Sequence, residues 1–345
     1  MNLIKKFSLR AAMVLVVAGS SVLWSQTEKV DYKAKLVELQ KQRQELYQQM
    51  TEASKTGDLN AYNAARNKYT KLGEEIKKIE AKLAAQGSKI AQIKSSINRG
   101  IQYTKMGQYE NAVAAYDRAI SLDSTNAKAY FGKAIALGKL RRYDEAKAAY
   151  LKSIKLDPSY PKAYFNLGIL YRRLEEYDKA IEVYRRALTH DSTLAKAHYE
   201  IGYTYSKKKD YLNATKAFEK AVKVDPQYVK AYNALGVAYI KLGKYGKAIA
   251  PLKKAIAIRP SFSEAYYRLS TALNNLGRYH EALDAAKKCL IYRKHFAPAY
   301  IEIGKAYEGL GDKANAITNY EMASKLNRRW VKWVTWKINS LKQSQ

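Results

Sequence analysis

The sequence has little of what disulfide frameworks, β-sheet proteins and metal centres need. Only one of its 345 residues is cysteine, Cys289, so the chain cannot form a disulfide with itself or build a cysteine-based metal cluster. Six prolines and 17 glycines are too few turn-forming residues for a β-sandwich or β-barrel. Four histidines leave little material for a zinc or iron site. These shortages favour an all-helical chain without a metal centre.

Motifs of the common enzyme classes are also missing. The sequence contains no glycine-rich phosphate loop, nucleophile elbow, metal-binding histidine pair or dinucleotide fingerprint. Adjacent carboxylates such as Glu175 and Glu176 fall on expected exposed turns or helix faces, where nothing would desolvate them. We therefore expect a protein that is not an enzyme and that needs no cofactor.

Residues 1–25 have the pattern of a secretory signal peptide. Lys5, Lys6 and Arg10 precede an apolar run from Ala11 to Trp24. This run is shorter than the roughly 20 residues that a membrane-spanning helix needs. We predict export to the periplasm, the cell envelope or the medium of a bacterium, and a retained membrane anchor is the alternative.

Residues 26–92 contain two stretches in which apolar residues alternate at spacings of three and four. Arg43 interrupts the first stretch, and Asp58 or Asn60 is the expected N-cap of the second helix. The simplest interpretation is an antiparallel helical hairpin. The alternative is an intermolecular coiled coil that makes a homo-oligomer through residues 30–92. The second stretch is the more regular, with Tyr62, Ala65, Tyr69, Leu72, Ile76, Ile79 and Leu83.

A repeat of 34 residues fills residues 93–330 without an insertion. The twentieth position is alanine in every unit, and the seventeenth is tyrosine in the first six. The eighth position is glycine, alanine or serine. The seven units are 93–126, 127–160, 161–194, 195–228, 229–262, 263–296 and 297–330.

This register resembles the tetratricopeptide repeat (TPR) family, and the resemblance implies a right-handed α-solenoid of seven helix pairs. Small residues at positions 8, 20 and 27 would let the two helices of a unit approach closely, while large residues at positions 4, 7, 11, 17 and 24 would fill the space between them. Twenty of the 30 tyrosines occupy positions 4, 11, 17 and 24, so we expect most of them to be packing residues. Cys289 at position 27 and His198 at position 4 are expected to pack in the same way.

Residues 331–345 are predicted to form a capping helix and a tail. Because the last repeat of a solenoid leaves an apolar face open, Trp330, Trp333 and Ile338 would cover it. Tryptophans among basic residues are also typical of an interfacial membrane or partner site, which is the alternative.

The resemblance also implies a concave groove, lined by positions 2, 5, 6, 9, 12 and 13 of the first helix of each unit, that holds a peptide or a partner helix. A row of lysines beside aromatic rings would suit an acidic, extended segment. The family's carboxylate clamp is incomplete here, because Ile97 and Ile101 stand where lysine and asparagine are expected. A lysine row that serves only solvation is the alternative. The candidate groove residues are Lys94, Asn98, Lys128, Phe131, Lys162, Phe165, Asn166, Lys196, Tyr199 and Lys230.

The formal net charge is +31, and residues 93–345 carry most of it. Such a field attracts anionic partners in general. We predict a non-enzymatic scaffold of the bacterial cell envelope that binds an acidic protein or peptide. Nucleic acid is not expected, because we predict export and find no Arg-Gly or base-stacking motif. The alternative is a protein that docks on a polyanion, a membrane surface or the cell wall through the basic solenoid and the C-terminal tryptophans.

Overall fold

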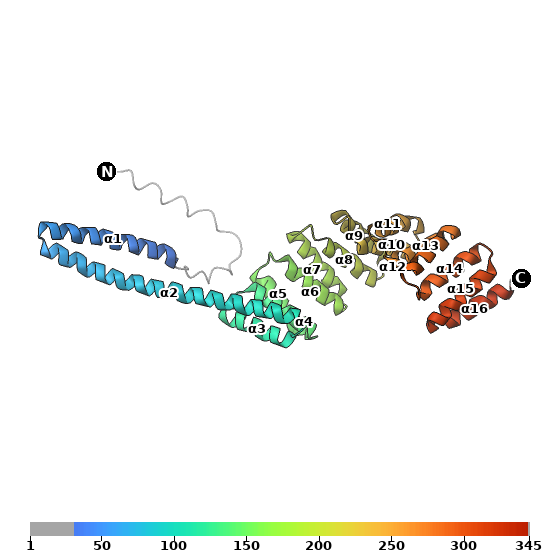
Figure 1. The fold of residues 1–345 in the computed structure, drawn as a ribbon, viewed down its shortest axis with the longest axis horizontal. Coiled ribbons are helices and arrows are strands. Elements are labelled where there is room, and N and C mark those ends of the chain that lie inside the picture. The colour runs from blue at the N-terminus through green and yellow to red at the C-terminus, as the bar shows by residue number, and fades with distance from the viewer. Residues whose placement is uncertain (1–30, 344–345) are drawn as a thin grey trace, which may run out of the picture. The chain divides into compact units, whose positions relative to one another are not determined.

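The structure is a computed structural model that describes residues 31–343, and all regular structure in this range is helical (Figure 1). It divides into two units, Met1–Lys94 and Ser95–Gln345. The predicted signal peptide, residues 1–25, lies outside the described residues. The helices are α1 (Tyr32–Thr56), α2 (Leu59–Lys105), α3 (Tyr109–Leu122), α4 (Ala127–Lys139), α5 (Tyr143–Leu156), α6 (Pro161–Arg173), α7 (Tyr177–His190), α8 (Ala195–Lys207), α9 (Tyr211–Val224), α10 (Val229–Lys241), α11 (Tyr245–Ile258), α12 (Ser263–Asn275), α13 (Tyr279–Tyr292), α14 (Ala297–Gly309), α15 (Lys313–Leu326), the 3-10 helix η1 (Arg328–Trp330) and α16 (Val331–Gln343).

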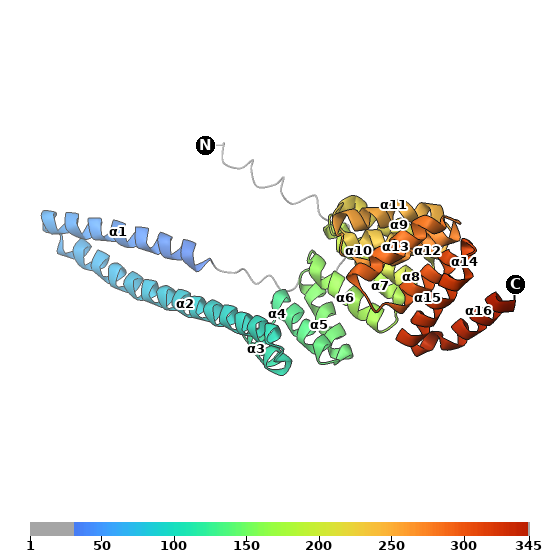
Figure 2. The same ribbon diagram turned by 45° about the vertical axis from the view of Figure 1, so that its right-hand side comes forward.

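In the first unit, α1 and α2 lie side by side as an antiparallel hairpin (Figures 1 and 2). Leu39 of α1 is buried against Ile76 and Ile79 of α2. Gly57 ends α1 in the left-handed conformation, and the carboxylate of Asp58 accepts a hydrogen bond from the N–H of Ala61 at 2.9 Å. Asp58, rather than Asn60, therefore caps α2. Association of this hairpin with a second chain stays a prediction.

Helix α2 continues without a break into the first repeat and ends at Lys105. Its residues 84–105 contain no proline to interrupt the backbone hydrogen bonds, and Ile90, Ile93 and Ile97 continue the apolar pattern of the hairpin. The last part of α2 therefore serves as the first helix of the first repeat.

In the second unit, the repeats form an α-solenoid, which confirms the predicted fold class. After α2, the first helix of each unit (helix A) begins at every thirty-fourth residue, from Ala127 to Ala297. The second helix (helix B) begins at position 17 of each unit, from Tyr109 to Lys313. The alanines at position 20 and the small residues at position 27, Cys289 included, have no exposed surface. Burial also raises the pKa of the Cys289 thiol to about 11, as expected of a packing residue rather than a nucleophile.

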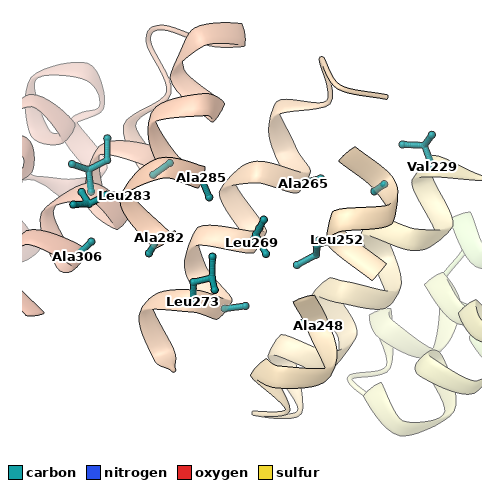
Figure 3. Packing of buried hydrophobic residues seen from close by; sticks show 14 residues of the cluster. Val229, Ala248, Leu252, Ala265, Leu269, Leu273, Ala282, Leu283, Ala285 and Ala306 are labelled. Carbon is teal, nitrogen blue, oxygen red and sulfur yellow. The ribbon is translucent and has the colours of Figure 1, made fainter. Parts of the chain in front are cut away.

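Close contact between the two helices of a unit depends on the small residue at position 8, which is glycine in five of the seven units. Gly168 of α6 faces the ring of Tyr184 of α7, and a Cβ on this glycine would lie only 2.5 Å from the ring. Between neighbouring units, apolar side chains interdigitate. Figure 3 shows Leu252 of α11, Leu269 of α12 and Ala282 of α13 in one such buried cluster. The stacking of neighbours thus buries faces that a single helix pair would leave exposed.

Position 15 of every repeat adopts the left-handed backbone conformation in the turn between helices A and B. Glycine occupies it in four units, but Arg141, Glu175 and Lys209 have φ 62° there. A residue with a Cβ is strained in this region by about 1–2 kcal/mol. The three non-glycine turns are therefore sites at which the native chain is not optimally stable.

Replacing Lys209 with glycine is expected to raise the free energy of unfolding by up to about 1 kcal/mol, because the relief of strain exceeds the added freedom of the unfolded chain. The measurement is urea unfolding followed by circular dichroism. The matched control is Gly243→Ala, which introduces the strain at the equivalent position and should lower stability. A Lys209→Gly protein less stable than the wild type would contradict this account of the turn.

Helix α16 covers the last repeat. Val334, Ile338 and Leu341 are buried against α14 and α15, and Trp330 and Trp333 pack partly into the same cluster. The ring of Trp333 meets the ring of Tyr320 edge-on at 5.4 Å. Trp336, in contrast, is 62% exposed. Two of the three C-terminal tryptophans therefore belong to the cap, and only Trp336 is left for contact with a surface.

None of the helices in residues 31–343 is both long enough and apolar enough to span a membrane.

Candidate partner-binding groove

The inner face of the solenoid is formed by the A helices. From α4 to α14, consecutive A helices contact each other. Consecutive B helices of the described chain do not, and each contacts the A helix that lies between them instead. A stack of helix pairs that is closer on one side curves toward that side. The side chains of the A helices therefore line a concave surface, which we call the groove.

Nine of the ten predicted groove residues lie in the second unit. The tenth, Lys94, is the last residue of the first unit. Asn98 is exposed on α2, while Asn166 on α6 is half-buried and donates a hydrogen bond from its side chain to the carbonyl of Lys162 at 2.9 Å. Four lysines are exposed on successive A helices: Lys128, Lys162, Lys196 and Lys230.

These four lysines, which we call the position-2 row, occupy the second residue of α4, α6, α8 and α10. No ion pair found in residues 31–343 includes any of them, and the first turns of these helices contain no acidic residue. A positive charge at a helix N-terminus opposes the helix dipole, which costs about 0.3–1 kcal/mol per site. Helix stability therefore does not explain why lysine recurs there.

A second row of cations lies at position 13, in the last turn of the same helices. There the helix dipole favours positive charge, so this row has a structural explanation. Positions 2 and 13 are eleven residues apart, or roughly 16 Å along an α-helix. The groove consequently has cations along both edges and a floor between them. The position-13 row is Lys139, Arg173, Lys207 and Lys241.

The predicted aromatic residues are half-buried parts of the repeat packing. The ring of Phe131 lies 5.0 Å from that of Tyr160, and the ring of Phe165 lies 5.7 Å from that of Tyr184. Tyr199 contacts two rings, Phe218 at 5.7 Å and Tyr228 at 5.2 Å. These rings therefore present one face or edge to the groove and are held rigidly by their neighbours.

Sequence reasoning missed the charged pairs inside the groove. On its floor, Nε of Arg172 lies 3.2 Å from Oε2 of Glu200, and both side chains are about four-fifths buried. The guanidinium of Arg172 also lies 5.0 Å from the ring centre of Tyr203. Burial raises the pKa of Glu200, against the opposing pull of Arg172. The only sequence signal for this pair was the carboxylate of Glu200 at position 6 of its unit. Nothing in the repeat pattern indicated that it would pair with Arg172, at position 12 of the preceding unit.

The character of the groove changes at α12. Glu264 pairs with Arg268 at 2.9 Å, and the buried carboxylate of Glu302 accepts hydrogen bonds from Lys305 at 3.0 Å and from Asn274 at 2.8 Å. Glu308 likewise pairs with Lys337 of the capping helix. Each carboxylate here is neutralised by a neighbour. Among the A helices from α4 to α14, the groove cations without an ion pair therefore lie on α4, α6, α8 and α10.

Profiles of the TPR family match most of the second unit. Those described as "Tetratricopeptide repeat" match residues 132–195, 229–262, 252–284 and 297–329, and one described as "TPR repeat" matches residues 100–140 and 202–243. No curated protein sequence matches the chain.

Solved TPR structures resemble the chain in fold. The TPR protein YrrB is 24% identical with a TM-score of 0.50, over 56% of this chain and 99% of its own. The C-terminal part of a TPR protein from Cytophaga hutchinsonii is 17% identical with a TM-score of 0.59, over 67% and 95%. A TPR protein from Parabacteroides merdae is 17% identical with a TM-score of 0.51, over 73% and 99%. With its seven helix pairs in one register, the chain belongs to the tetratricopeptide repeat family.

Proposed function

We propose that this protein is a scaffold that captures an acidic, extended segment of a partner protein in the groove between α4 and α10. TPR domains are typically interaction modules rather than catalysts, and the solved relative YrrB is described as having an unusual peptide-binding site. The observation that carries the proposal is the position-2 row. Lysine recurs there on four successive helices, at a site where it disfavours the helix and makes no ion pair within the described chain.

The chemistry of the groove defines the partner segment. Exposed ammonium groups along the edge would bind carboxylates, and the edges of Phe131, Phe165 and Tyr199 would contact apolar side chains between them. An extended chain advances about 3.3 Å per residue, so a segment of several residues reaches from one repeat to the next. Several neighbouring acidic residues could therefore contact lysines of two or three repeats at once.

We further propose that this capture takes place in the bacterial cell envelope. The support is the basic start, short apolar run and small residues of residues 1–25. The test is to fuse residues 1–25 to a reporter phosphatase that is active only after export. An inactive fusion retained in the cytoplasm would contradict the proposed location without affecting the groove.

The alternative of polyanion or membrane docking is favoured by the net charge of +31 and the exposed Trp336. Salt separates the two functions. Binding that depends on charge alone should fall steeply between low and moderate ionic strength, because exposed charges are screened. A segment that also makes apolar contacts should be retained in part.

The experiment is affinity capture from a bacterial envelope fraction with the full chain as bait, washed at low and at moderate salt and analysed by mass spectrometry. One or a few proteins retained at moderate salt are the expected result. Retention of lipid or polysaccharide alone, lost at moderate salt, would overturn the scaffold proposal in favour of the alternative.

A further inference from the structure

A hollow of about 210 Å³ opens in the groove between α4 and α6. Its walls come from the apolar residues Ile135, Ile169 and Leu170 together with Tyr150 and Asn166. Lys139 and Arg173, which belong to the position-13 row, lie at its rim, and both are exposed. The hollow therefore combines a mostly apolar interior with two cations at its entrance.

The hollow is associated with a glycine at position 12 of the second repeat. Gly138 lines it, and a Cβ built on this glycine would have no heavy atom within 4 Å beyond its own helix and chain neighbours. The later units place a side chain at the equivalent position: Arg172, Ser206, Ile240, Asn274 and Glu308. Gly138 is the second-to-last residue of α4, and because it has no side chain it leaves the hollow open.

The size and lining of the hollow define its occupant. An apolar cavity of roughly 150 Å³ is large enough for benzene, so this hollow has room for a phenylalanine or leucine side chain. Charged groups beside such a side chain would face Lys139 and Arg173, which complement carboxylates. An occupant from a basic or uncharged segment would not use these two cations.

We propose that this hollow is an anchor subsite that takes one large apolar side chain, flanked by carboxylates, from the acidic partner segment. The inference rests on the proposed function and deepens it. The lysines of the position-2 row attract any acidic segment, whereas the hollow selects segments that carry an aromatic or branched aliphatic residue among their acids. Burying a phenylalanine in place of an alanine should tighten binding by roughly ten- to a hundredfold.

The test uses two fluorescein-labelled peptides of aspartate, glutamate and serine, identical except for a central phenylalanine or a central alanine. Fluorescence anisotropy gives their affinities for the full chain, for Gly138→Leu and for Gly138→Ala. Leucine at this position fills the hollow, while alanine adds only a methyl group. Both are better helix formers than glycine and meet no atom at the Cβ, so both variants should fold, which circular dichroism verifies.

We expect the wild type and Gly138→Ala to prefer the phenylalanine peptide at least about tenfold, and Gly138→Leu to bind both peptides equally. Equal binding of both peptides by the wild type would overturn the anchor subsite without contradicting the proposed capture of acidic segments by the groove. A phenylalanine preference that survives in Gly138→Leu would overturn it as well. If neither peptide binds the wild type, the proposed capture of acidic segments is wrong, and the anchor subsite with it.

Discussion

Replacing Lys128, Lys162 and Lys196 together with glutamate is expected to abolish capture of the partner while making the protein more resistant to heat. The loss of capture follows because three contiguous repeats would then repel an acidic segment. The gain in stability follows because glutamate at the second residue of a helix interacts favourably with the helix dipole, where lysine does not. At about 0.3–1 kcal/mol per site, the three changes should add roughly 1–3 kcal/mol to the free energy of unfolding at low salt.

The matched control makes the same charge change at the other end of a helix. Lys155, Lys223 and Lys325 are exposed in the last turns of the B helices α5, α9 and α15. Their replacement with glutamate lowers the net charge equally, but it should destabilise the helices and leave capture intact. Capture and thermal unfolding are measured side by side on the two triple variants. The comparison distinguishes binding at the position-2 row from attraction by the overall net charge. Equal loss of capture in both variants would show that only the overall field matters.

Replacing Tyr184 with alanine is expected to destabilise the solenoid by about 3–5 kcal/mol, because a fully buried aromatic side chain leaves a cavity that the packed helices cannot close. Tyr184 lies against Gly168 of the same unit and against Phe165 on the groove side. The loss should therefore reach the groove: Phe165 and the lysine beside it, Lys162, would no longer be held in place. Urea unfolding measures the stability, and capture at a temperature where the variant stays folded measures the effect on the groove.

A double-mutant cycle tests the contact itself. Gly168→Ala places a methyl group against the Tyr184 ring and should cost about 1–3 kcal/mol in the wild type. In the Tyr184→Ala background the same change should be nearly neutral, because its clashing partner is gone. Gly246→Ala, at an exposed helical glycine with open space around it, is the control and should stabilise slightly. Additive effects of Gly168→Ala and Tyr184→Ala would mean that the two residues do not restrict each other.

The sequence was sufficient to predict the fold, because a solenoid is held together by contacts between residues that are close to one another in the sequence. Ala180 belongs to a buried cluster with Tyr184 of its own unit and Ile201 of the next. The local spacing that makes each helix amphipathic therefore also decides how the helices stack. The burial of Cys289 followed from its register alone. The predicted contact stripe of Trp330, Trp333 and Ile338 was right, since the open face of the last repeat needs an apolar cover.

The groove was only partly predictable. Register placed Lys128, Lys162, Lys196 and Lys230 on one face, but the sequence does not show that none of them makes an ion pair in the described chain. The pairing of Arg172 with Glu200 and of Asn274 with Glu302 depends on the distance between neighbouring A helices, which the repeat pattern does not encode.

The sequence by itself determined that this protein is helical, that its helices pair every 34 residues and that one face of the stack is basic, because these properties depend on residue types at fixed local spacings. The tertiary structure decided which charges neutralise each other, how far α2 extends and where the groove opens. Gly138 shows the difference. In the sequence it is one glycine among 17. It lines a hollow because, in the packing of α4 against α6, no other atom fills the space that a side chain at this position would take.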